Sequence, residues 1–76
     1  MLEDIKIERL GHYDYKPLLI EIFDMDSNHM KNLLIDGTQF NACVALAEEN
    51  RKKIHGKYFE IRSRTEDKVL YTSLNK

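Results

Sequence analysis

The stretch from Thr38 to His55 most constrains the fold, because every local signal in it predicts an α-helix. Its apolar residues recur at helical spacing and form one stripe. Thr38 is expected to cap the N-terminus, and Gly56 is expected to supply the left-handed residue that ends the helix. The stripe consists of Phe40, Cys43, Val44, Ala47 and Ile54. A single amphipathic helix of this kind needs an apolar layer to pack against.

The segments on both sides of this helix have the patterns of β-strands. Leu18–Asp24 has apolar residues on both faces, which predicts a central strand. Met30–Ile35 is expected to pair with it as a hairpin, although a short helix beginning at Ser27 also fits its spacing. The other expected strands are Asp4–Leu10, Lys57–Arg64 and Val69–Leu74, of which the last two form a second hairpin.

This order of elements predicts an α+β fold. We expect a single, mostly antiparallel sheet of about five strands (β-β-β-α-β-β) with one helix packed on one face. The 76 residues are enough for a single compact domain, 1–76, and no more. A domain this small buries only about 60% of the surface of its unfolded chain. Because a deep substrate cleft would remove side chains from a small core, the length favours a protein that works through its outer surface.

The cysteine count and the N-terminus predict a cytoplasmic protein. Cys43 is the only cysteine, so no internal disulfide can form. Residues 1–4 (Met-Leu-Glu-Asp) have neither the basic start nor the apolar run of a signal peptide. The longest nearly apolar stretch, Pro17–Phe23, is far shorter than the roughly 20 residues of a membrane helix. We therefore expect no membrane partner.

No group of residues has the spacing of a catalytic or metal site. Asp24, Asp26 and Asn28 open like a calcium loop, but His29 replaces the turn glycine and Ile35 replaces the bidentate glutamate. The three histidines are too widely separated to match a zinc motif, and the glycines stand alone at turns. Cys43 falls on the apolar helix stripe and is expected in the core. We predict no enzyme activity, no cofactor, no metal and no small-molecule substrate.

The charges are divided unevenly along the chain. Residues 1–50 contain four Lys/Arg and ten Asp/Glu, a net charge of −6, whereas residues 51–76 contain eight and three, a net charge of +5. Such a division can produce two oppositely charged surfaces that steer a charged partner. It can equally disappear if strands from the two halves pair in one sheet. The strand order decides between these alternatives.

The basic half supports one hypothesis of function. Lys and Arg side chains near an exposed aromatic ring such as Tyr58 are how a sheet holds single-stranded nucleic acid. The overall pI of about 6.3 and the absence of a known nucleic-acid motif count against this reading. An RNA- or DNA-binding module is therefore the alternative function. Its binding residues would be Arg51, Lys52, Lys53, Lys57, Arg62 and Arg64.

The acidic half supports the leading hypothesis, a non-catalytic interaction protein that binds another macromolecule, above all a protein. Tyr13 and Tyr15 are expected to anchor an interface, because tyrosine offers rigid contact area with a polar tip. Asp24 and Asp26 would add negative charge toward a basic partner. The partner is another protein or a second copy of the chain, because an open sheet leaves edges that can be extended. Small phage and plasmid proteins that inhibit a host factor commonly have this format.

Overall fold

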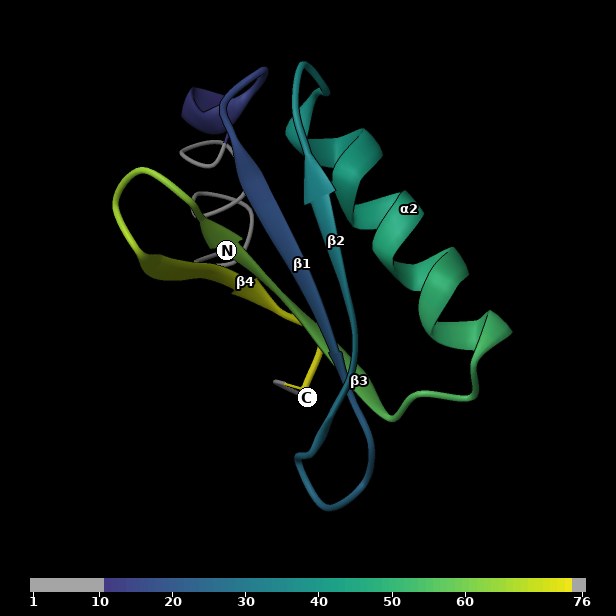
Figure 1. Ribbon diagram of the computed structural model, residues 1–76. Coiled ribbons are helices and arrows are strands. Elements are labelled where there is room, and N and C mark those ends of the chain that lie inside the picture. The colour runs from purple at the N-terminus through teal and green to yellow at the C-terminus, as the bar shows by residue number, and fades with distance from the viewer. Residues whose placement is uncertain (1–10, 75–76) are drawn as a thin grey trace, which may run out of the picture.

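The computed structural model describes residues 11–74, which form one antiparallel sheet with a single α-helix against it (Figure 1). The predicted α+β fold is confirmed, but the described sheet has four strands rather than about five. The expected strand at Asp4–Leu10 lies outside the described residues. The elements are the 3-10 helix η1 (Gly11–Tyr13), β1 (Leu18–Phe23), β2 (His29–Ile35), α2 (Phe40–Lys53), β3 (Tyr58–Ser63) and β4 (Lys68–Thr72).

The strand order is β2-β1-β3-β4, so β1 is central, as its apolar residues on both faces predicted. β1 forms a hairpin with β2 and pairs on its other side with β3. Ile20 of β1 lies opposite Leu33 of β2 and Ile61 of β3. The segment after Ser27 is therefore a strand, and the alternative short helix is wrong, because these residues complete the hairpin with β1.

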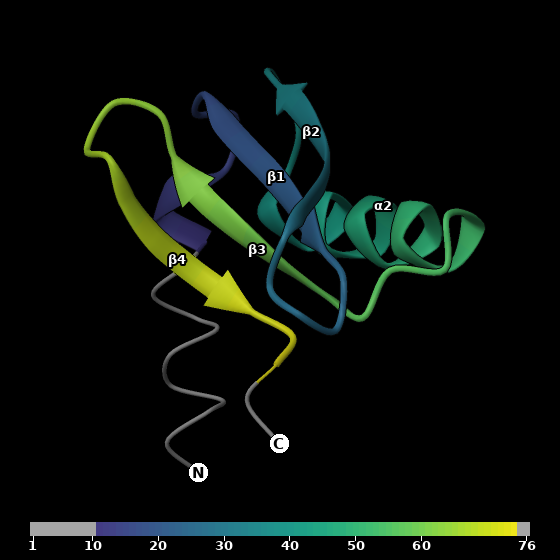
Figure 2. The same cartoon turned by 60° about the horizontal axis from the view of Figure 1, so that its bottom comes forward.

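The core lies between α2 and one face of the sheet, which we call the near face. Leu18, Ile20 and Ile22 alternate along β1 and are all fully buried there. Figure 2 shows α2 crossing behind the strands on this side. The buried apolar stripe of the helix meets them and consists of Phe40, Cys43 and Ala47, with Val44 and Ile54 packed at its margin. Each large side chain buried in this way contributes about 1.5–3 kcal/mol.

The helix begins at Phe40, and Gln39 rather than Thr38 occupies the N-cap position. Thr38 Oγ1 donates instead to Asp36 O at 3.4 Å. The capping acceptor comes from the loop before β1: Asp14 Oδ1 accepts a hydrogen bond from the Phe40 backbone N–H at 2.7 Å. The prediction that Thr38 caps the helix was therefore wrong, because a carboxylate distant in sequence performs this role.

Asp14→Ala is expected to lower the free energy of unfolding by about 1 kcal/mol, the usual loss when a helix cap is removed. Thr38→Ala should cost less than about 0.5 kcal/mol, because the threonine hydroxyl satisfies no helical N–H. Urea denaturation followed by circular dichroism measures both values. Asp14→Asn, which keeps an acceptor oxygen, should recover most of the loss. An equal cost for the alanine variants of Asp14 and Thr38 would contradict this assignment.

The helix ends in a Schellman motif in which His55, not Gly56, has the left-handed backbone. His55 has a φ of 61°, and the N–H groups of His55 and Gly56 donate to Lys52 O at 3.2 Å and Arg51 O at 2.8 Å. The prediction for Gly56 was wrong because the turn closes one residue earlier. Gly56 is instead needed for space, since a Cβ there would lie 2.5 Å from Ile22 Cγ2.

Candidate protein-docking surface

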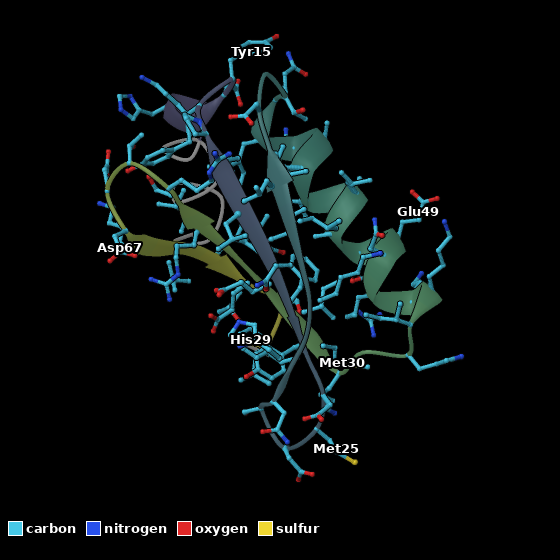
Figure 3. The ribbon with its side chains drawn as sticks, in the orientation of Figure 1. Tyr15, Met25, His29, Met30, Glu49 and Asp67 are labelled. Carbon is cyan, nitrogen blue, oxygen red and sulfur yellow. The ribbon has the colours of Figure 1, made fainter. Side chains whose placement is uncertain are left out.

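Three exposed apolar side chains are distributed along β2 and the turn that leads into it. Met25 in the turn is 80% exposed, and Met30 and Leu34 on β2 are 42% and 68% exposed. Figure 3 shows Met25 and Met30 at the same end of the sheet. Single exposed apolar residues are ordinary, but three on one hairpin form a candidate contact surface. We call these three side chains, together with the outer edge of β2, the hairpin surface.

The outer edge of β2 pairs with no strand within residues 11–74, because β2 ends the strand order. Edge strands are commonly protected by proline, by charged side chains or by bulges. β2 contains no proline and a single Lys, Lys31, and its bulge lies at its start, opposite Ile22 and Phe23. The segment 32–35 therefore offers an edge to which another strand can be added.

An aromatic cluster supports the start of β2 on the far face of the sheet, the face turned away from α2. Phe23 and Tyr58 are buried there and stack with ring centroids 4.8 Å apart, and the His29 ring lies 4.7 Å from Phe23. Tyr58 Oη also donates to Ser27 Oγ at 3.0 Å, which ties the hairpin turn to the sheet. The hairpin surface is thus built on a packed support.

Glu21 is buried on the same far face, where Arg62 and His29 contact its carboxylate. Its Oε1 accepts a hydrogen bond from Arg62 Nε at 3.4 Å, and its Oε2 lies 2.9 Å from His29 Nε2. Arg62 also donates to Asp67 Oδ1 at 3.4 Å. A buried carboxylate is tolerated when it has such partners. This network links β1, β2 and β3 and fixes the position of His29 at the hairpin surface.

The turn between β1 and β2 is organised by the Asp24 carboxylate. Asp24 Oδ1 accepts hydrogen bonds from the N–H groups of Asp26 at 2.8 Å and Asn28 at 2.9 Å. These bonds, that from Asn28 foremost, lower the pKa of Asp24. Of the two aspartates predicted to bind a partner, Asp24 therefore has one oxygen engaged in the turn. Asp26 is exposed next to Met25 in the chain and belongs to the hairpin region.

The two predicted tyrosine anchors lie elsewhere. Tyr15 precedes β1 and Met25 follows it, so the two residues lie at opposite ends of the sheet (Figure 3). Tyr15 is 62% exposed, has a φ of 66°, and its N–H donates to Thr38 O at 2.8 Å. Tyr13 packs against the core, and its Oη donates to Glu66 Oε1 at 2.9 Å. The structure therefore does not gather the four predicted partner-binding residues into one surface.

Most of the six predicted nucleic-acid-binding residues are paired with carboxylates. β3 lies between β1 and β4, so Arg62 of β3 and Arg64 just after it meet acidic residues from the front half of the chain. The division of charge along the sequence thus largely dissolves into pairs. Of the six, Lys53 and Lys57 have no ion pair to a described residue. The pairs are Arg51 and Lys52 with Glu48, Arg62 with Glu21 and Asp67, and Arg64 with Asp36.

A groove of about 460 Å³ separates the second half of α2 from the β3–β4 hairpin and brings Arg51 and Lys57 together. Phe59 and Tyr71 line it, with their rings stacked 5.8 Å apart. Arg51 Nε donates to Glu48 Oε1 at 3.1 Å, and this hydrogen bond lowers the pKa of Glu48. Since Glu48 already balances Arg51, Lys57 is the only cation of the groove without an ion pair to a described residue.

Sequence reasoning missed the contribution of Met25, Met30 and Leu34. One signal was present: the run 33–35 (Leu-Leu-Ile) must place apolar side chains on both faces of a strand, whereas a single helix covers one face. This signal becomes informative only once β2 is known to be an edge strand. The pattern alone could not assign that position.

No family model, no curated protein and no solved structure matches the chain. In the part of the chain that the structure describes, no helix is long and apolar enough to cross a membrane. Over the same residues, no three His, Cys, Asp or Glu side chains are grouped so that they could hold a metal ion. The hairpin surface is therefore the feature of the described residues from which a function can be inferred.

Proposed function

We propose that this protein is a non-catalytic interaction protein that binds another protein through the hairpin surface. One observation carries the proposal: the outer edge of β2 is unpaired within residues 11–74 and exposes Met30 and Leu34. Strand addition uses such an edge, because main-chain hydrogen bonds supply affinity and alternate side chains supply specificity.

The distribution of charge supports protein binding over nucleic-acid binding. Phosphate recognition needs several Lys or Arg side chains that are free to contact phosphates and to displace the counterions of the nucleic acid. Arg62 and Arg64 are held by carboxylates instead, and Arg51 is held by Glu48. The hairpin surface, by contrast, has one Lys and several exposed apolar groups, as a protein-docking strand requires.

Site-specific photo-crosslinking in the native cell tests the proposal. A benzophenone amino acid placed at Leu34 is expected to give a discrete protein adduct, because this side chain would lie inside the interface. The matched control carries the same group at Val69 of β4, which is 41% exposed but distant from β2 in the strand order. Mass spectrometry identifies the adducts.

An adduct at position 34 that is absent at position 69 supports the proposal. Equal adducts at both positions, or none at position 34, contradict it. A second measurement uses Met30→Glu in the chain that carries the crosslinker at Leu34. Because a buried charge in the interface is costly, this substitution should remove most of the adduct. An undiminished adduct would show that β2 is not the docking edge.

A further inference from the structure

We propose that the protein bound at the hairpin surface is a basic protein, different from this chain, that also covers the far face of β1 and β2. There it places a lysine or arginine beside Glu60 of β3. This inference rests on the proposed function and names the chemistry of the partner. It concerns the side of the sheet that α2 does not cover.

The far face of the sheet carries an apolar contact that is continuous with the hairpin surface. α2, the single α-helix of residues 11–74, packs on the near face. On the far face, Leu19 of β1 lies directly opposite Leu34 of β2, and neither is covered by a helix of these residues. Leu19 is half-buried and Leu34 is exposed. Because Leu34 belongs to both surfaces, a protein docked on β2 can extend over β1.

The next row of the far face is acidic. Glu21 of β1 and Glu60 of β3 lie directly opposite each other, and both alternate with core residues of the near face. The Cβ atoms of residues paired in this way are about 5 Å apart, and like charges there destabilise a sheet. On its other side Glu21 faces Asn32 of β2, which carries no charge. The free protein therefore holds two adjacent carboxylates next to the apolar contact.

The basic groups of the far face contact Glu21 and leave Glu60 unbalanced. Arg62 donates to Glu21 Oε1 and to Asp67 Oδ1, both at 3.4 Å, and His29 contacts Glu21 Oε2. Glu60 is half-buried and forms no ion pair with another described residue. On this face, the described strands and the β3–β4 turn thus present three carboxylates and one arginine. The carboxylates are Glu21, Glu60 and Asp67.

Charge complementarity identifies the partner. A lysine or arginine beside Glu60 would relieve its repulsion with Glu21, whereas an acidic protein or a nucleic acid would be repelled. The leucine pair next to this row requires apolar groups beside that cation. Adjacent strands are about 4.8 Å apart, so a segment that lies over β1 is one strand away from Glu60. An extended lysine or arginine side chain spans this distance.

Charge reversal at Glu60 tests the inference in the chain that carries the benzophenone at Leu34. Glu60→Lys should reduce the adduct at least about tenfold, because the new lysine would face the cation of the partner. The matched control is Glu49→Lys on α2, which reverses an exposed carboxylate that also has no ion pair with a described residue. This control should leave the adduct within about twofold of the original yield.

The stability of the same variant separates docking from folding. Glu60→Lys replaces a like-charge pair with Glu21 by an opposite-charge pair, so the free protein should unfold at a higher urea concentration. Loss of the adduct in a more stable protein assigns Glu60 to the interface. A lower urea midpoint together with loss of the adduct would instead assign it a structural role. Glu60→Gln, which removes the charge without reversing it, should give an intermediate adduct.

Salt provides an independent measurement. Crosslinking in a lysate of the native cell compares the adduct at position 34 at about 0.05 M and about 0.5 M salt. The higher concentration should reduce the adduct at least about threefold, because it screens the charges on both sides of the interface. An adduct that is equally abundant at both concentrations would contradict a basic partner.

Three outcomes of the charge-reversal experiment overturn the inference. They are an adduct that Glu60→Lys leaves intact, a Glu49→Lys chain as impaired as Glu60→Lys, and an adduct that consists of two copies of this chain. In each of them position 34 still captures a protein, so the docking role of β2 stands. If position 34 captures nothing, the proposed function fails and the inference fails with it.

Discussion

Gly56→Ala is expected to lower the free energy of unfolding by about 2 kcal/mol, within the range found for overpacked cores. A Cβ at this position would lie 2.5 Å from Ile22 Cγ2 and 3.3 Å from Arg51 Cγ. The Arg51 side chain can move, but the Ile22 side chain is fully buried in the core between the sheet and α2 and cannot. The end of α2 or the start of β3 must therefore shift.

Two controls isolate this contact. Gly11→Ala should be nearly neutral, because a Cβ there meets nothing within 4 Å. In an Ile22→Ala background the Cγ2 atom is absent, so the cost of Gly56→Ala should fall by at least about 1 kcal/mol. Urea denaturation of the wild type, the two single variants and the double variant gives the coupling free energy between positions 22 and 56. Additive losses would show that Gly56 is required for a reason other than its approach to Ile22.

The Cys43 thiol is expected to react with iodoacetamide at least about 100-fold more slowly in the folded protein than in the same chain unfolded in urea. Burial raises the pKa of Cys43 from 9.0 to about 11, which leaves about a hundredfold less thiolate near pH 8. The thiol is also shielded by the core around it. Mass spectrometry of timed samples measures the rates, with a small free thiol in the same urea as the control. A native rate within about tenfold of the unfolded rate would contradict this.

The same shift makes stability depend on pH. Because the pKa of Cys43 is raised in the folded state, its contribution is fully present below pH 9.0 and is lost as the pH rises toward about 11. The loss should amount to about 2 kcal/mol. Lysines and tyrosines titrate in the same range, so the measured quantity is the difference between wild type and Cys43→Ala. A difference that stays constant from pH 8 to pH 11 would refute the shift.

Local patterns predicted the elements well. The apolar stripe of α2 depends only on residues within one helix, and the alternation of β1 and β3 depends only on residues within one strand. The hairpin β1–β2 followed because Leu18–Phe23 and His29–Ile35 are separated by a short polar turn. Such features are set by spacing along the chain, which the sequence displays directly.

Features that join distant segments could not be predicted in this way. The Asp14 cap on α2 and the pairing of Arg62 with Glu21 both connect residues far apart in sequence. The position of β2 at an edge belongs to the same class, and the candidate site depends on it. Sequence reasoning therefore chose Tyr13 and Tyr15 by residue type alone, whereas the hairpin surface became visible only with the strand order.

The central place of β1 has a consequence for how the chain reaches its fold. β1 pairs with β3, and contacts between them, such as Glu21 with Arg62, span 41 positions of sequence. Closing so long a loop costs entropy before the pairing repays it, so this step is expected to limit the folding rate. During synthesis the β1–β2 hairpin and α2 emerge first, and the inner edge of β1 stays open until β3 leaves the ribosome. In that interval, both edges of the β1–β2 hairpin are unpaired, whereas in the folded protein β3 covers the edge of β1.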